Sequence, residues 1–151
     1  CTLDHSHDLR RMRYCISSGF MGRMGLSGDI LALGTEQWAL VQEAMQFYTH
    51  ARTVLKDCTI AVYRELKTDS VRYAEGLQAV LFTGRNSSAL LVCHSFSNAG
   101  SHSLSFPFPA KQLRLSAQFG FIDALSVADG RACLAEMPDH ETCALLFELV
   151  D

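Results

Sequence analysis

The second half of the chain consists of short apolar runs that recur about every 8–12 residues, and this spacing restricts the possible folds most strongly. Stretches rich in Gly, Asn, Asp, Ser and Pro separate the runs, as turns would. Short strands at such intervals are typical of an antiparallel β-sandwich or barrel. The predicted strands are 70–75, 77–84, 88–96, 102–108, 111–119, 120–128, 131–137 and 142–150.

Local signals indicate how some of these strands begin, end and pair. Asp129-Gly130 separates two runs and predicts a tight hairpin. Pro107 and Pro109 are expected to end the strand before them, because proline cannot donate to a ladder. The runs LQAVLF and CALLFEL are continuously apolar, so we expect them at the centre of a sheet.

The first half of the chain has a helical pattern. Apolar residues recur at three- and four-residue steps over about 36–54, and Thr35 is a plausible N-cap residue. We expect this helix to pack its apolar stripe into a core. The stripe consists of Trp38, Val41, Met45 and Tyr48, widened by Ala44, Phe47 and Ala51.

A glycine-rich segment precedes this helix. Five glycines between residues 19 and 34 argue against a continuous helix and predict loops with short helical turns near 8–14 and 27–32. The segment MGRMGLSGDI matches neither phosphate-loop pattern nor the nucleophile elbow, so it predicts a tight turn with Asp29 as a cap or ion-pair partner.

The change from helical to strand patterning marks the expected domain boundary. The segment CTIAVYRELK, residues 58–67, is compatible with an extended strand or a short helix. We place the boundary at residues 66–70, which divides the chain into a helical segment, 1–66, and an antiparallel β domain, 67–151. The predicted fold class is therefore α+β.

Composition excludes several classes of protein. Of the 151 residues, 48% are hydrophobic and 19% are charged, which is enough apolar surface for a core and argues against disorder. The net charge of −3 gives no reason to expect nucleic acid as a partner, and no run approaches the ~18 apolar residues of a membrane helix. The chain begins with Cys1 and a polar segment unlike a signal peptide, so we expect a processed product or part of a longer chain.

Cysteine usage favours reduced thiols in a cytoplasmic setting. The six cysteines include no CxxC pair, and Cys93, Cys133 and Cys143 lie within apolar runs, where free cysteine packs as a small hydrophobe. One or more disulfides remain the alternative. The first segment also holds Cys1, His5, His7 and Cys15, but their spacing lacks the second short pair of a zinc site, so no metal is expected.

The segment GRMGLSGDILALGTEQWALVQEAMQFY resembles the end of the catalytic barrel in the retaining α-galactosidases of glycoside hydrolase family 36. In that family GR-x-G-x-SGD-I leads into a helix containing EQW and ending in FY, and a small antiparallel β domain follows, similar to the runs at 76–82 and 89–96. The resemblance covers the chain from about residue 10 to its end. The matching positions are Gly22, Arg23, Gly25, Ser27, Gly28, Asp29 and Ile30, then Glu36, Gln37, Trp38, Val41, Phe47 and Tyr48.

The resemblance implies a supporting role, because the catalytic motifs of the family do not precede the matching segment. Members use two aspartates, whose carboxyl groups lie ~5–5.5 Å apart in a retaining enzyme. The SD-x-x-D-x-x-x-R motif does not occur here, and Asp4, Asp8 and Asp29 stand in other contexts. The tripeptide Lys67-Thr68-Asp69 fits K-x-D, but it follows the segment that resembles the end of the barrel, whereas the family's motif lies before that segment. A complete barrel also needs ~200 or more residues. We therefore assign no catalytic, cofactor-binding or metal residue and expect the chain alone to be inactive. The predicted partners are the catalytic barrel of a parent chain and a second copy of this chain, with α-galactoside bound only by the parent enzyme.

Two other functions stay open. An independent β-sandwich module could bind carbohydrate or protein through exposed aromatic side chains, for which the candidates are Tyr73, Phe106, Phe108, Phe119 and Phe121. A small enzyme of another type would need convergent titratable residues, and its candidates are His50, His94 and Cys93. We expect the aromatic residues to lie in the core and His94 to be a surface or satisfied interior residue.

Overall fold

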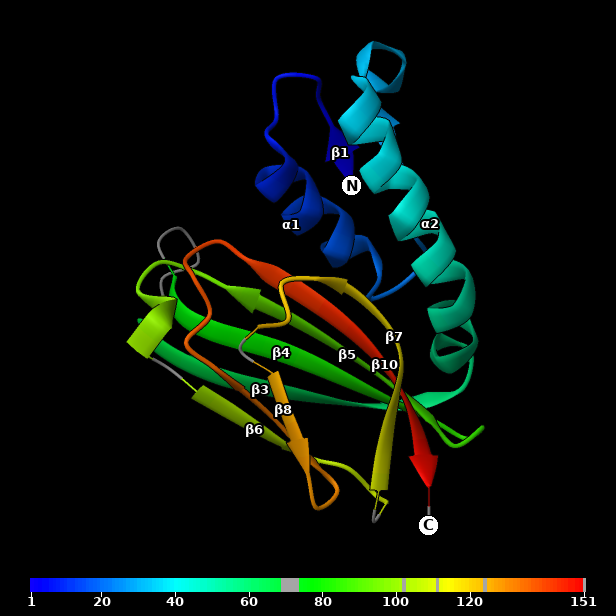
Figure 1. Ribbon diagram of the computed structural model, residues 1–151, viewed down its shortest axis with the longest axis vertical. Helices are drawn as coiled ribbons and strands as arrows, with labels where there is room; N and C mark the ends of the chain where they lie inside the picture. Colours follow the sequence, from blue (N-terminus) through cyan, green and yellow to red (C-terminus); the bar gives the residue numbers. More distant parts are fainter. Residues whose placement is uncertain (69–73, 102, 111, 124, 151) are drawn as a thin grey trace.

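The computed structural model describes residues 1–68, 74–101, 103–110, 112–123 and 125–150. Two helices, α1 (Leu9–Gly19) and α2 (Thr35–Leu55), lie on one face of a five-stranded antiparallel sheet. A three-stranded antiparallel sheet covers the other face (Figure 1). The predicted α+β class is thereby confirmed.

The five-stranded sheet has the order β3-β4-β5-β10-β7, with all neighbours antiparallel. The two continuously apolar runs form β4 and β10, which lie inside the sheet as predicted, since such strands are buried on both faces. A register shift between Leu146 and Phe147 marks an irregularity where β10 pairs with β7. The strands span Cys58–Thr68 (β3), Glu75–Gly84 (β4), Ser88–Ser95 (β5), Gln112–Gly120 (β7) and Thr142–Val150 (β10).

The three-stranded sheet has the order β6-β9-β8, comprising Ser103–Pro107, Arg131–Ala135 and Leu125–Ala128. The predicted Asp129-Gly130 hairpin is confirmed, because Ala128 pairs with Arg131 across it. Both turn residues have positive φ, 49° and 68°, as the tight hairpin turn requires. β6 ends at Pro107, as the missing N–H of proline predicts.

Alternation of side chains along the central strands creates two cores. The core between the sheets contains Leu91, Phe106 and Phe147. The core between the helices and the sheet contains Phe47 and Phe119 together with apolar residues of α1. The five-stranded sheet therefore contributes one face to each core and connects the helices to the three-stranded sheet.

The N-terminal segment forms a β-α-β-α arrangement. β1 (Thr2–Leu3) and β2 (Ser27–Gly28) pair in parallel, and α1 connects them. A short 3-10 helix, η1 (Ile30–Ala32), then leads into α2; a second, η2, spans Ala99–Ser101. Gly28 has a φ of +100°, and a Cβ there would lie 2.0 Å from the Leu3 carbonyl oxygen, so only glycine permits this pairing.

The structure corrects the predicted helices at several points. α1 extends to Gly19, well past the short turn expected near 8–14, because no glycine interrupts it before its last residue. The second expected turn, 27–32, is confirmed in its latter half, where η1 covers Ile30–Ala32, whereas Ser27 and Gly28 form β2. Asp29 is at the N-cap position of η1, but its side chain makes no capping hydrogen bond within the described part. α2 begins at Thr35, so Gly34 rather than Thr35 is its N-cap residue.

The predicted apolar stripe of α2 is partly wrong. Val41 is buried, and so are Ala44, Phe47 and Ala51, which widened the stripe. Trp38 and Met45, however, are 37% and 46% exposed. The sheet and α1 contact the face that contains Phe47. At roughly 100° per residue, Trp38 and Met45 lie on the opposite side of the helix, away from that contact.

The strand boundaries also differ from prediction in places. The ambiguous segment 58–67 is extended and forms β3, so the change from helix to strand falls between Leu55 and Cys58. β8 covers only the second half of the expected strand 120–128, and β9 ends two residues before the predicted end at 137. Most of the strand expected at 70–75 lies outside the described residues, and β4 begins at Glu75.

Candidate functional site

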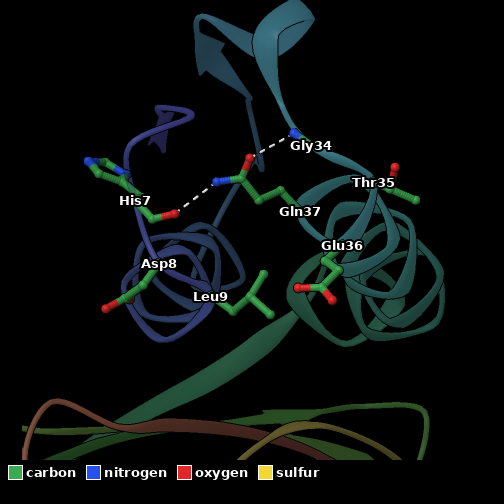
Figure 2. Close-up of a pocket in the computed structure, with 7 residues that line it drawn as sticks. All are labelled: His7, Asp8, Leu9, Gly34, Thr35, Glu36 and Gln37. Atoms are coloured by element: carbon green, nitrogen blue, oxygen red, sulfur yellow. Dashed lines mark hydrogen bonds between the residues drawn. The ribbon is translucent and has the colours of Figure 1, made fainter.

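A cleft of about 470 Å³ lies between the N-terminal ends of α1 and α2 (Figure 2). The loop after β1 and the loop after β2 form its walls, so the cleft opens beyond the carboxyl ends of the two parallel strands. In open α/β sheets and in barrels, ligands bind at this end of the strands. The lining residues are His7, Asp8, Leu9, Gly34, Thr35, Glu36 and Gln37.

The side chain of Gln37 connects the two loops (Figure 2). Its Oε1 accepts a hydrogen bond from the backbone N–H of Gly34 at 2.8 Å, which caps α2. Its Nε2 donates to the carbonyl oxygens of His7 at 2.8 Å and His5 at 3.0 Å. Every polar atom of this amide is thus used to hold the two loops in a fixed relation.

The electrostatics of the cleft combine two helix N-termini with two carboxylates. Helix N-termini carry partial positive charge, which the carboxylates of Asp8 and Glu36 compensate. Oδ1 of Asp8 accepts a hydrogen bond from the backbone N–H of Arg11 at 2.7 Å, so this carboxylate is the N-cap of α1. His7 also lines the cleft, and its Nδ1 is buried without a hydrogen-bond partner within the described residues.

The zinc candidates of the first segment are not brought together. The amino group of Cys1 donates to the Gly25 carbonyl at 2.6 Å, while Cys15 lies on α1. Nδ1 of His5 lies 3.7 Å from Oδ1 of Asp4. Among the residues that the structure describes, no three His, Cys, Asp or Glu side chains converge as metal ligands would.

The residues considered for an independent enzyme are also dispersed. His50 lies exposed on α2, where its Nδ1 is 2.9 Å from the Gln46 carbonyl oxygen. Cys93 and His94 are consecutive on β5, so their side chains point to opposite faces of the sheet. They therefore form no common catalytic group.

His94 is a satisfied interior histidine, as expected. It is 5% exposed, and its Nε2 lies 3.2 Å from Oγ of Ser18 on α1. The ring of Tyr14 packs edge-on against it, with centroids 4.8 Å apart. Burial lowers the pKa of His94 to about 4, although a hydrogen bond with the Tyr14 backbone acts in the opposite direction.

The aromatic side chains proposed as a sugar-binding face lie mainly in the core. Phe106, Phe108 and Phe119 are buried, and Phe119 belongs to a different core from the other two. Phe121 is half-buried, and Tyr73 lies outside the described residues. The described members of the set therefore do not form an exposed platform on one sheet face.

A cluster of ion pairs around a buried carboxylate was not predicted from the sequence. Glu141 precedes β10 and is 5% exposed, and its Oε1 lies 3.0 Å from Nε of Arg10 and 3.7 Å from a terminal nitrogen of Arg13. Its backbone N–H donates to Oγ of Ser95 at 2.7 Å. The carboxylate occurs in the turn sequence PDHE, where no sequence pattern distinguishes it from an exposed turn residue.

No model of a known protein family matches the chain, and a search of curated proteins found no relative. In the described part of the chain, no helix has the length and apolar character needed to cross a bilayer.

Proposed function

We propose that this chain is the C-terminal part of an α-galactosidase-like glycoside hydrolase of family 36, in which it supports a catalytic barrel. In this proposal the chain contributes no catalytic carboxylate, binds no cofactor, and acts in the cytoplasm as part of the parent enzyme. α-Galactoside is a ligand of the parent enzyme only.

The observation that carries the proposal is the β1-α1-β2-α2 arrangement. Two parallel strands joined by a helix and followed by another helix are the repeating unit of a (β/α)8 barrel. Parallel sheets occur almost only where further strands and helices cover them. Here β1 and β2 pair only with each other among the described strands, and both residues of β2 are exposed. Further barrel strands would complete this sheet.

The uncovered side of α2 also supports the proposal. Trp38 and Met45 are seven residues apart, so they lie on the same side of the helix, and both are substantially exposed. Leu31, one turn before α2, is 90% exposed. An apolar stripe on the side of a helix opposite the face packed on a sheet is expected where the helix has a second packing partner, which here would be the barrel.

In this proposal the cleft of Figure 2 lies at the catalytic face of the barrel, but its polar groups make structural hydrogen bonds within the chain. Asp8 caps α1 and Gln37 joins the loops, so we assign them the role of shaping the rim beside the active site. The catalytic aspartates would come from the preceding part of the parent chain.

Two measurements test the proposal together. The purified 151-residue chain should not hydrolyse p-nitrophenyl α-galactoside, whereas coexpression with the segment encoded upstream of Cys1 should give a soluble complex that does. Turnover by the chain alone would contradict the proposal. An upstream reading frame lacking K-x-D and SD-x-x-D-x-x-x-R motifs would contradict it as well.

A further inference from the structure

Two buried cysteines face each other across the middle of the five-stranded sheet. Cys93 on β5 and Cys143 on β10 are directly opposite partners in the antiparallel register. Both side chains belong to the core between the two sheets, and neither is more than 1% exposed. The backbone N–H of Ser95 donates to the carbonyl of its opposite residue Glu141 at 2.9 Å, and hydrogen-bonded pairs recur at every second residue, so Cys93 and Cys143 form a hydrogen-bonded pair. The Cα atoms of such pairs are about 5.5 Å apart, which is within the ~4.4–6.8 Å range found for disulfides.

The neighbouring strands place small residues on either side of this pair. Ala79 on β4 is the partner of Cys93, and Gly120 on β7 is the partner of Cys143. The pair is thus flanked in its row by a methyl group and by a residue without a side chain. A Cβ at Gly120 would lie 2.3 Å from the Thr142 carbonyl oxygen, so this position cannot readily gain a side chain.

The remaining cysteines lie elsewhere. Cys1, Cys15 and Cys58 border the core on the helix side of the sheet. Cys133 lies on β9 of the other sheet, where its Sγ is 3.3 Å from Oγ of Ser105. Cys93 and Cys143 are therefore the pair that the strand register selects from among the six cysteines of the chain.

We propose that Cys93 and Cys143 form a redox-sensitive pair, which closes to a cross-strand disulfide when the chain folds in the presence of a low-molecular-weight disulfide such as oxidised glutathione. This inference does not depend on the proposed function. In a reducing compartment the pair stays as the two thiols that the structure contains.

The chemistry is thiol–disulfide exchange in two steps. One cysteine thiolate attacks a sulfur of oxidised glutathione, forms a mixed disulfide and releases one glutathione. The second cysteine thiolate then attacks the protein sulfur and releases the other glutathione. The protein loses two S–H bonds and gains one S–S bond, and the two protons and two electrons are carried by two molecules of reduced glutathione.

Burial determines when this exchange can occur. Burial raises the pKa of the Cys93 thiol well above its usual value, and the hydrogen bond and charge of the neighbouring Cys143 thiol raise it further. Because the thiolate is the reactive form, the folded pair is protected from exchange. The disulfide forms before β10 is inserted between β5 and β7, and it then links β10, the last strand in the sequence, to β5 at the centre of the sheet.

The test is refolding from denaturant with a mixture of oxidised and reduced glutathione, followed by alkylation of free thiols, proteolysis and mass spectrometry. We expect a linked pair of peptides containing Cys93 and Cys143, and a thermal midpoint roughly 5 to 10 °C above that of protein refolded with a reductant. A different linkage, such as Cys93 with Cys133, or the absence of any linkage would overturn the proposal.

Three variants and one rate comparison sharpen this test. Cys93→Ala and Cys143→Ala should each remove the linkage, whereas the matched control Cys133→Ala should retain it. Folded wild-type protein in the same glutathione mixture should oxidise at least tenfold more slowly than refolding protein. Equal rates would contradict the inference that the disulfide forms before β10 is inserted into the sheet. The peptide linkage in wild-type protein decides the question even if a core variant does not fold.

Discussion

Oε1 of Glu141 lies 3.0 Å from Nε of Arg10, and this contact ties the segment before β10 to α1. The two partners have very different surroundings, because the side chain of Glu141 is 7% exposed and that of Arg10 is 54% exposed. Arg13 adds a second cation at 3.7 Å. The loss in the free energy of unfolding should therefore depend on which partner of this contact is removed.

Removing the cations should be more harmful than neutralising the acid. Arg10→Met combined with Arg13→Met leaves a buried carboxylate without a counter-charge and should cost about 3 kcal/mol in the free energy of unfolding. Glu141→Gln leaves the arginines exposed to water and should cost about 1 kcal/mol. Urea denaturation measures both. Arg11→Met is the control and should change stability by less than about 0.5 kcal/mol, and the reverse order of the two losses would contradict the prediction.

Acid should destabilise the protein through His94. Its pKa is about 4 in the folded protein and 6.5 in an unperturbed histidine, so the unfolded chain binds the proton more tightly between these values. The stability that neutral His94 provides is fully present above pH 6.5 and is lost as the pH falls toward 4. Over this interval the loss should be on the order of 3 kcal/mol.

Denaturation at a series of pH values measures this effect. His94→Asn should flatten the dependence between pH 6.5 and 4, whereas His50→Gln, a change at an exposed histidine, should leave it unchanged. Asp4 and Asp139 have pKa values lowered mainly by hydrogen bonds, but they act below pH 4 and do not interfere. An equal slope in wild-type and His94→Asn proteins would rule out His94 as the source.

The two sides of α2 should respond differently to substitution. Phe47→Ala removes a buried ring and should cost about 3–5 kcal/mol, whereas Trp38→Gln and Met45→Gln should each cost less than about 1 kcal/mol in the isolated chain. If the exposed stripe packs on a barrel, Trp38→Gln and Met45→Gln should each weaken copurification with the upstream segment. The exposed polar position Gln46→Glu is the control for copurification, and an equal effect there would contradict a specific contact.

Sequence periodicity predicted the architecture where one pattern dominated. β4 and β10 are apolar on both faces because helices cover one side of the sheet and strands cover the other, and their continuous apolar runs indicated this. The Asp129-Gly130 hairpin was equally clear, because its turn requires residues that accept positive φ. In both cases a local requirement and the tertiary arrangement agree.

Other features depend on partners that no local pattern identifies. Trp38 and Val41 both fit a helical stripe, but only the position of the sheet decides that Val41 is buried and Trp38 is half-exposed. Glu141 is buried because arginines from α1 reach it. The parallel pairing of β1 and β2 involves two residues in each strand, which is too short for any periodicity to be recognised.

Gly28 provides a test of that parallel pairing. Its φ of +100° and the 2.0 Å approach of a Cβ to the Leu3 carbonyl oxygen mean that Gly28→Ala must separate β2 from β1. The hydrogen bond from the backbone N–H of Ser27 to the Cys1 carbonyl, 3.0 Å long, should break with it. We therefore expect at least tenfold faster amide hydrogen exchange at Ser27, while amides of β5 and β10 keep their protection.

Gly25→Ala is the matched control, because a Cβ at that position meets no atom within 4 Å. It should leave exchange at Ser27 within about twofold of wild type, since neither its backbone nor its surroundings oppose a methyl group. Unchanged exchange in Gly28→Ala would contradict the parallel pairing, and with it the β-α-β-α unit. Because that unit carries the proposed relation to a barrel, Gly28→Ala should also reduce copurification with the upstream segment, whereas Gly25→Ala should not.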